Sequence, residues 1–205
     1  VTAQAAIALS KAFKPKLALL GRSPSPFQEP VWMDGLNDNG TTKKAIIAND
    51  FKDTAPTPKE VEAKFKYYTA NSEINANLNA MRKLGADAQY YSVDILDKKA
   101  LATAFTDIKA DLGSITALVH GAGILEDKLL LEKTDEQFAR VYATKVTGML
   151  NLLEACKNEN LRTWALFSSV TARMGNKGQS DYAAANEILN KTAQNMALEH
   201  KEMKV

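Results

Sequence analysis

Short apolar runs alternate with longer segments in which apolar residues recur every three or four positions. Apolar runs bounded by glycine are typical of strands, whereas a period near 3.6 residues indicates amphipathic helices. The predicted strands cover residues 16–21, 88–95, 115–123 and 163–169. The predicted helices cover residues 1–13, 57–69, 71–85, 97–113, 134–158 and 180–201. This alternation predicts βαβ units, and therefore an α/β fold with a doubly wound parallel sheet of the Rossmann-like type, in which the run at residues 16–21 is a buried strand.

Residues 24–58 interrupt the alternation. The stretch from Arg22 to Gly40 is rich in Pro, Ser, Asn, Asp and Gly, which is typical of loops. Because long structureless loops are uncommon inside compact domains, we interpret residues 24–58 as a loop insertion. Two separate helices are expected after it: one capped by Thr57 and one capped by Asn71.

Length and composition narrow the classes of function. A chain of 205 residues can form one domain with an insertion, and its net charge of +2 does not indicate a nucleic-acid partner. No apolar run approaches the roughly 18 residues that a bilayer span requires, so no membrane association is expected. The lone cysteine, Cys156, excludes a disulfide framework and fits a reducing compartment such as the cytoplasm. The two histidines, His120 and His200, lack metal-ligand spacing, so no metal site is predicted.

Polar residues follow each predicted strand at the end where parallel sheets bind ligands. In such sheets, ligands lie beyond the carboxyl ends of the strands. The segments at these positions are Gly21–Ser23, Asp94, His120–Gly123 and Ser168–Ser169.

Four side chains are predicted to gather at one pocket near these ends. Tyr182 and Asn186 are four residues apart on one predicted helix and share a face, while Ser169 ends the preceding strand. Lys145 lies on the helix before that strand. A phenol, whose pKa is ordinarily near 10, needs a nearby cation to exchange protons at neutral pH. The set therefore suits proton donation to a carbonyl oxygen, with Lys145 as the cation, Ser169 as the hydrogen-bond donor to the carbonyl, and Asn186 holding the lysine or a water.

Each of these residues also has an ordinary structural interpretation. Lys145 alone fits a solvated helix lysine, Ser169 a strand-end hydroxyl bonded to backbone, and Tyr182 a buried ring with an exposed hydroxyl. Asp94 fits a cap for the next helix equally well, and His120 is expected to be packed or bonded to backbone. The catalytic interpretation rests on the four side chains occurring together at their spacings.

Those spacings resemble the ketoreductase domains of polyketide and fatty acid synthases, which are short-chain dehydrogenase/reductases. Lys145 stands 24 residues before Ser169, Ser169 stands 13 before Tyr182, and Asn186 follows four residues later. Most members of that superfamily carry Tyr-x-x-x-Lys, whereas the synthase ketoreductases place asparagine after the tyrosine and lysine upstream, as here. The segments "GRSPSP" and "HGAGILEDKLL" most resemble the ketoreductase of bacterial polyunsaturated fatty acid synthases.

The resemblance implies a substrate, a cofactor and partners. The substrate would be a β-ketoacyl chain on an acyl carrier protein, and NADPH would be the hydride donor. The neighbouring synthase domains would be further partners. Arg22, assisted by Ser23, would bind the 2′-phosphate of the cofactor, and Asp94 would contact its adenine. Gly121, Ala122 and Gly123 would let the backbone lie against the cofactor ribose.

The resemblance also implies the configuration of the product. Leu125, Glu126 and Asp127 resemble a Leu-Asp-Asp motif of ketoreductases that form the D (3R-type) alcohol, with Glu126 departing from it. Met174 stands eight residues before Tyr182, where ketoreductases of the opposite handedness often carry tryptophan. The loop around Met174 would form a lip over the substrate. Both features favour the D alcohol.

Two expected parts of the fold are missing from the 205 residues. Dinucleotide-binding folds begin with a strand and a glycine-rich turn, and neither precedes the first helix here, nor does a last strand follow residue 205. We therefore expect a fragment of the domain, truncated at both ends, that binds NADPH poorly by itself. Two alternatives stay open: a non-catalytic structural reductase-like subdomain, and a free-standing short-chain reductase or epimerase.

Overall fold

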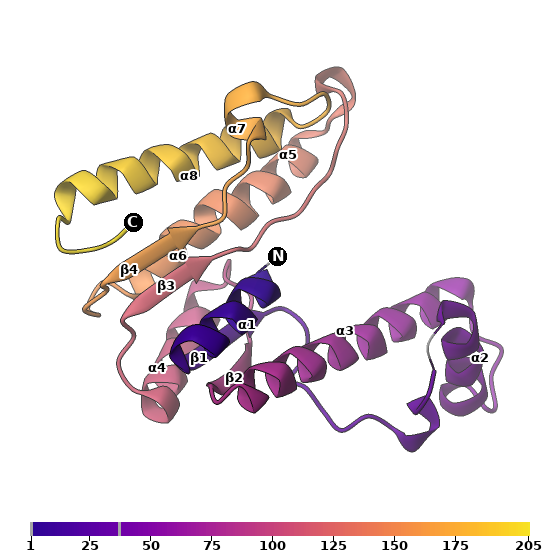
Figure 1. Cartoon of the computed structure of the whole chain (residues 1–205). Helices are drawn as coiled ribbons and strands as arrows, with labels where there is room; N and C mark the ends of the chain where they lie inside the picture. The colour runs from indigo at the N-terminus through magenta and orange to yellow at the C-terminus, as the bar shows by residue number, and fades with distance from the viewer. Residues whose placement is uncertain (1, 37) are drawn as a thin grey trace. The chain divides into compact units, whose positions relative to one another are not determined.

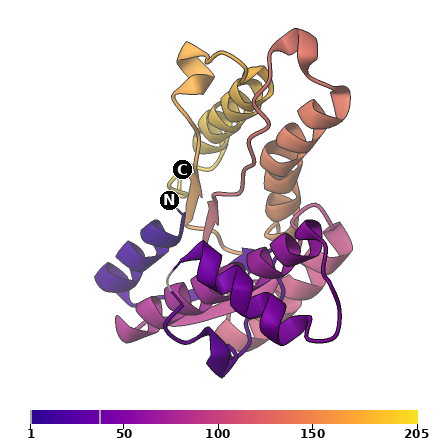
Figure 2. The same cartoon turned by 90° about the vertical axis from the view of Figure 1, so that its right-hand side faces the viewer.

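Two parallel, two-stranded sheets organise the part of the chain that the structure describes, one in each of two compact units (Figure 1; the second view is Figure 2). The units are Val1–Ser92 and Val93–Val205, and each is described by itself. The computed structural model describes residues 2–36 and 38–205. Parallel strands joined through helices confirm the predicted α/β class.

Over residues 2–36 and 38–92, unit 1 contains one sheet, three helices and a short 3-10 turn. Strand β1 pairs with β2 from Lys16 opposite Asp87 to Gly21 opposite Ser92. The elements are α1 (Thr2–Phe13), β1 (Lys16–Gly21), η1 (Val31–Met33), α2 (Asn39–Asp50), α3 (Pro58–Lys83) and β2 (Asp87–Ser92).

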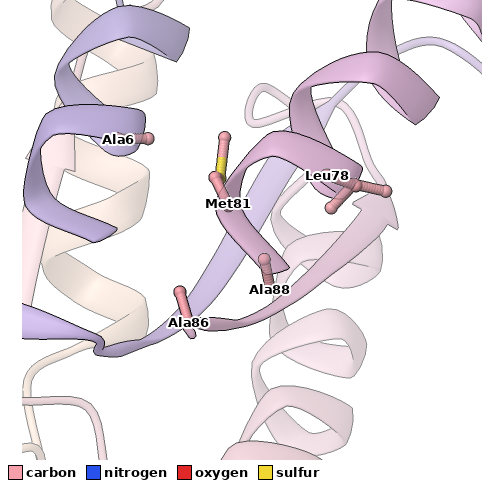
Figure 3. Packing of buried hydrophobic residues seen from close by; sticks show 5 residues of the cluster. All are labelled: Ala6, Leu78, Met81, Ala86 and Ala88. Carbon is pink, nitrogen blue, oxygen red and sulfur yellow. The ribbon is translucent and has the colours of Figure 1, made fainter. Parts of the chain in front are cut away.

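The core of unit 1 lies between helices α1 and α3 and one face of the sheet (Figure 3). Ala6 of α1, Met81 near the end of α3 and Ala88 of β2 are all nearly inaccessible to solvent, with Met81 and Ala88 at 0% exposure. Leu17 and Leu19 of β1 pack against this cluster but are only half-buried. The prediction of a buried strand at 16–21 is therefore met only in part, because Lys16 is exposed and the other five residues are half-buried.

The predicted loop insertion contains a helix. Helix α2 begins after Asp38, whose carboxylate accepts hydrogen bonds from the backbone N–H groups of Gly40 and Thr41. Ile46 on this helix is fully buried, and α2 packs against α3. The loop predicted over 24–58 therefore includes a helix at Asn39–Asp50, which an aspartate cap and the burial of Ile46 stabilise.

The two helices predicted on either side of residue 70 are one continuous helix of 26 residues. Thr57 caps it as expected, forming a capping box with Glu60. Asn71 is not a cap but a buried residue of this helix: its amide accepts a hydrogen bond from Phe27 N and donates one to Phe27 O. The sequence pattern predicts a helix boundary at this polar residue, whereas its side chain holds the loop that contains Phe27.

Unit 2 holds the other sheet and the remaining helices. Strand β3 pairs with β4 from Ala117 opposite Thr163 to His120 opposite Leu166. The elements are α4 (Lys98–Leu112), β3 (Ala117–His120), η2 (Leu130–Glu132), α5 (Asp135–Tyr142), η3 (Ala143–Thr147), α6 (Gly148–Ala155), β4 (Thr163–Leu166), α7 (Thr171–Met174) and α8 (Ser180–Glu199).

Side chains alternate across the sheet of unit 2. Leu118 and Trp164 are register partners and are buried, whereas the next pair, Val119 and Ala165, is exposed. At the outer edge of β4, Lys204 adds a parallel bridge: Trp164 N donates to Lys204 O, and Lys204 N donates to Arg162 O.

The structure also bears on membrane insertion. Within residues 2–36 and 38–205, no helix combines the length and the apolarity needed to cross a bilayer.

Candidate active site

A π-helical turn carries Lys145. The long helix predicted over 134–158 is divided into α5, the π turn Ala143–Thr147 and α6, and Thr134 caps its start as predicted. Gly148 N donates to Ala143 O, five residues back, which is the hydrogen bond that defines a π turn. Such turns are frequent at functional sites. Lys145 is the central residue of the five that form this π turn.

The Lys145 side chain points inward and is almost fully buried, with the residue 3% exposed. Its ammonium donates to Phe167 O at 2.7 Å and lies 5.8 Å from the centre of the Tyr182 ring. Burial lowers the pKa of Lys145 below its usual value. A Cβ at Gly123 would lie 2.8 Å from Lys145 Cε, so any side chain at this position would push the lysine side chain aside. Lys145 is therefore not the solvated helix lysine of the ordinary interpretation.

Asn186 is fully buried one helical turn after Tyr182. Its amide nitrogen donates to Tyr182 O at 2.7 Å, while its Oδ1 has no hydrogen-bond partner in the described part of the chain. A buried acceptor without a partner costs free energy, so it marks a place where a donor is expected. Ser168 at the end of the preceding strand donates to Asn186 O, which ties that segment to α8.

Ser169 has both of its acceptor positions in use. The backbone N–H and the hydroxyl of Thr171 donate to Ser169 Oγ at 3.2 Å and 2.7 Å. A hydroxyl carries one proton and two lone pairs, so the Ser169 proton is left for another acceptor. Among the residues that the structure describes, no hydrogen bond joins Ser169 to Tyr182. The structure thus brings Lys145, Tyr182 and Asn186 together. Ser169 forms no hydrogen bond with these three residues among those described, and only its neighbour Ser168 bonds to Asn186.

His120 is bonded to backbone, as the sequence analysis expected. The ring is 1% exposed, and its Nε2 lies 2.9 Å from Lys145 O. Because a carbonyl only accepts, Nε2 carries the proton, and the histidine holds the π turn from strand β3. Burial, assisted by the Lys145 charge, lowers the pKa of His120 from 6.5 to about 4.

This lowered pKa predicts a dependence of stability on pH. Between pH 6.5 and about 4 the unfolded chain binds a proton that the folded chain does not, so the free energy of unfolding falls as the pH drops through that window. The shift corresponds to about 3 kcal/mol. His120→Gln, whose amide N–H donates but does not titrate, is expected to remove this part of the slope in denaturant unfolding measured at a series of pH values. His200→Gln, at an exposed histidine, is the matched control. Equal slopes for His120→Gln and the parent would contradict the prediction.

The predicted cofactor residues of unit 2 lie on two loops. Gly121, Ala122 and Gly123 follow β3 directly, with Gly121 and Ala122 half-buried and Gly123 exposed. Asp94 accepts a hydrogen bond from Leu96 N and does not cap α4, because Asp97 does so. The capping alternative for Asp94 is therefore wrong, and its contact with adenine stays a prediction.

The predicted phosphate-binding residues lie in unit 1. Arg22 is exposed and forms no ion pair with the described carboxylates. The turn that carries it is held by Tyr90, whose hydroxyl donates to Ser23 O at 2.9 Å. A Cβ at Gly21 would lie 2.6 Å from that hydroxyl, so the glycine makes room for the clamp.

The segment with the predicted stereocontrol residues is held by side chains that the sequence analysis did not single out. Glu126 forms a two-pronged ion pair with Arg140 of α5, which lowers the pKa of the Glu126 carboxyl. Asp127 accepts from Gln179 at 2.8 Å. Leu125 is 59% exposed and Met174, on α7, is 87% exposed. Helix α7 replaces what the sequence predicted only as a loop.

A buried ion pair is the main feature that the sequence analysis missed. The side chains of Lys133 and Asp181 are each 2% exposed, and Lys133 Nζ lies 2.7 Å from Asp181 Oδ2. Asp181 directly precedes Tyr182, and this position beside a predicted catalytic residue is the feature of the sequence that could have pointed to it. Its partner Lys133 lies 48 residues earlier, and nothing in the neighbouring sequence identifies it as the partner.

A groove in unit 1 involves different residues. It has a volume of about 710 Å³ and is lined by Phe27, Asn75 and Arg82, among others. None of the predicted site residues lines it.

The alternation of helices with parallel strands is the Rossmann-like arrangement of short-chain dehydrogenase/reductases. A family profile described as "KR domain" matches residues 2–202. The chain belongs to this family of ketoreductase domains.

Relatives and solved structures agree with this family. A polyunsaturated fatty acid synthase from Thraustochytrium sp. is 37% identical over 183 residues, which are 86% of this chain and 6% of the relative. Polyketide synthase PksN from Bacillus subtilis is 37% identical over 123 residues, 60% of this chain and 2% of the relative. The crystal structure of an N-terminal ketoreductase from the macrolactin assembly line has a TM-score of 0.71 and 27% identity, covering 99% of this chain and 33% of that one. The chain thus spans a small part of the synthases that it matches.

Proposed function

We propose that the protein reduces a β-ketoacyl thioester, carried by an acyl carrier protein, to the β-hydroxyacyl thioester with NADPH as the hydride donor. Membership of the ketoreductase family supports the reaction class. The observation that carries the proposal is the buried Lys145 ammonium, 5.8 Å from the centre of the Tyr182 ring.

Tyr182 is the proton donor in this proposal. Its hydroxyl forms no hydrogen bond within residues 2–36 and 38–205, so it is available to a ketone oxygen. As the proton leaves, the phenol becomes negative, and a nearby ammonium in a buried setting stabilises that charge strongly. One N–H of the Lys145 ammonium donates to Phe167 O, so its other two N–H groups can donate to the phenol and to a neighbouring acceptor.

Ser169 positions the ketone. Because Thr171 donates twice to its oxygen, the Ser169 proton can point toward a substrate carbonyl. A second donor at that oxygen stabilises the negative charge that develops during reduction.

Asn186 holds the lysine or a water. Its unpartnered Oδ1 accepts from an N–H of Lys145 or from a water that returns a proton to the site. Its Nδ2 is fixed on Tyr182 O, so the side chain cannot turn away without losing that bond.

The residues present fit a nicotinamide dinucleotide phosphate. Arg22 offers a guanidinium without a carboxylate partner among the described residues, and a guanidinium matches a phosphate in shape and charge. Ser23 would add a hydroxyl, Asp94 would contact the adenine, and the Gly121–Gly123 segment, which directly follows β3, would place backbone against the ribose. NADPH, when bound, supplies the hydride.

The family relationship and the residues near the site support the proposed substrate and its handedness. The relatives are synthases of fatty acids and polyketides, which favours an acyl chain on a carrier protein and contacts with neighbouring domains. The Leu125–Asp127 segment and Met174 favour the D (3R-type) alcohol. A purely structural, non-catalytic role is disfavoured because Lys145, Ser169, Tyr182 and Asn186 are all retained.

Arg22→Leu tests the proposal and its cofactor. The full-length protein is expected to oxidise NADPH in the presence of a β-ketoacyl thioester, followed by absorbance. Loss of a charge-assisted phosphate contact of about 1.5–3 kcal/mol should raise the KM for NADPH roughly 10- to 100-fold. The KM for NADH should change little, because NADH lacks the 2′-phosphate. Lys16→Leu, an exposed cation at the start of the same strand, is the control.

Absence of any reduction by the parent protein would remove the enzymatic proposal. An unchanged KM for NADPH in Arg22→Leu would remove Arg22 from the cofactor site alone.

A further inference from the structure

Three contacts join the segment 126–133 to residues 178–181 at the start of α8. Lys128 N donates to Gly178 O, Gln179 Nε2 donates to Asp127 Oδ2, and Lys133 pairs with Asp181. We call the last of these, with its bond from Lys133 Nζ to Glu126 O at 2.6 Å, the Lys133–Asp181 clasp. Lys133 thus bridges a carboxylate and a backbone carbonyl from two distant segments.

The clasp is buried at both ends, and burial makes it a poor source of stability. Taking two charges out of water costs about as much as their attraction returns, and apolar pairs of similar volume often replace buried ion pairs without loss. Directional contacts of this kind are better suited to fixing one arrangement of the segments that they join.

Each end of the clasp adjoins a residue that the proposed reaction uses. Asp181 precedes Tyr182 in the chain, and its Oδ1 accepts the Tyr182 N–H at 2.9 Å. The other end is Glu126 O, in the middle of the Leu125–Asp127 segment. One ammonium therefore connects the backbone of the proton donor with the segment implied in stereocontrol.

We propose that Lys133 is a positioning residue: through Asp181 and Glu126 O, it fixes the Leu125–Asp127 segment relative to Tyr182 and so fixes which face of the ketone meets the hydride. The inference rests on the proposed function. It adds a specificity-determining contact at residues that touch neither substrate nor cofactor.

The test compares Lys133→Met with the double variant Lys133→Met/Asp181→Leu in the full-length protein. The single variant leaves a buried carboxylate unpaired and is expected to lower the melting temperature. The double variant removes both charges and should recover most of the stability that the single variant loses. Lys157→Met, which breaks an exposed ion pair with Glu154 in the same unit, is the matched control.

The double variant is expected to show the defect in positioning despite its stability. With a β-ketoacyl thioester, the minor alcohol should rise at least tenfold as a share of the product, and kcat should fall roughly 10- to 100-fold at nearly unchanged KM. Chiral chromatography of the product and steady-state kinetics measure these quantities. A double variant with the product ratio and kcat of the parent would overturn the proposal.

A second measurement does not depend on activity. Hydrogen exchange of the backbone amides in residues 125–128 should become at least tenfold faster in the double variant, while Lys157→Met leaves it unchanged. If the amide exchange of residues 125–128 is unchanged in the double variant, the clasp does not position this segment, even if the protein is an active reductase. Faster exchange in a protein that reduces no thioester would support the clasp as a positioning contact and remove only the proposed function.

Discussion

Tyr182→Phe is expected to lower the turnover of a β-ketoacyl thioester by about 10²- to 10⁴-fold, the usual contribution of a positioned acid. The substitution removes one oxygen and keeps the ring that lies beside the Lys145 ammonium. Because the hydroxyl has no hydrogen-bond partner in the described chain, its loss should hardly change the melting temperature. Measuring NADPH oxidation together with thermal unfolding separates the two effects.

Tyr142→Phe is the matched control for this substitution. Tyr142 lies in the same unit, half-buried and stacked on Phe138, and takes no part in the proposed chemistry. It should retain the activity of the parent. Turnover by Tyr182→Phe at the rate of the parent would show that another group donates the proton.

Lys145→Met is expected to lower kcat by about 10²- to 10³-fold, a loss typical of one electrostatic contact to developing charge. Methionine fills similar space and removes a buried cation, so the melting temperature should change little. In the parent, burial lowers the pKa of Lys145, so activity should decline on the alkaline side earlier than an exposed lysine would cause. As the pH rises through that pKa the ammonium is lost, and this decline should be absent from the residual activity of Lys145→Met.

A pH–rate profile for parent and variant checks both statements. Lys191→Met, at an exposed lysine on α8, serves as control and should reproduce the profile of the parent. If Lys145→Met kept the kcat of the parent, the role of the ammonium would be refuted.

Elements with a strong local pattern could be predicted from the sequence. Strand β1 occupies residues 16–21 as predicted, and Thr134 caps α5, because apolar runs and caps act through neighbours in the chain. The sequence does not predict helix α2, because its helical signal is weak and its stability depends on the burial of Ile46 and on the packing of α2 against α3. The break expected before Asn71 was wrong because that amide bonds to Phe27, 44 residues away.

In the candidate site too, local relations could be predicted from the sequence, whereas long-range contacts could not. Spacing along the chain brought Tyr182 and Asn186 onto one helical face, and the structure confirms that they lie one turn apart and bonded. The hold of His120 on Lys145 O and the pairing of Lys133 with Asp181 join residues 25 and 48 positions apart. Contacts of that range depend on how the elements pack, which a periodic pattern does not encode.

The π turn at Ala143–Thr147 has a consequence for redesign of this site. Successive residues of a regular α-helix are rotated by about 100°, so removing one residue from the wide turn would rotate everything on one side of it by that angle. Transplanting Lys145 onto a helix of ideal geometry would therefore send its ammonium toward a different neighbour. The irregular segment, together with the imidazole that secures it, is the unit to transfer.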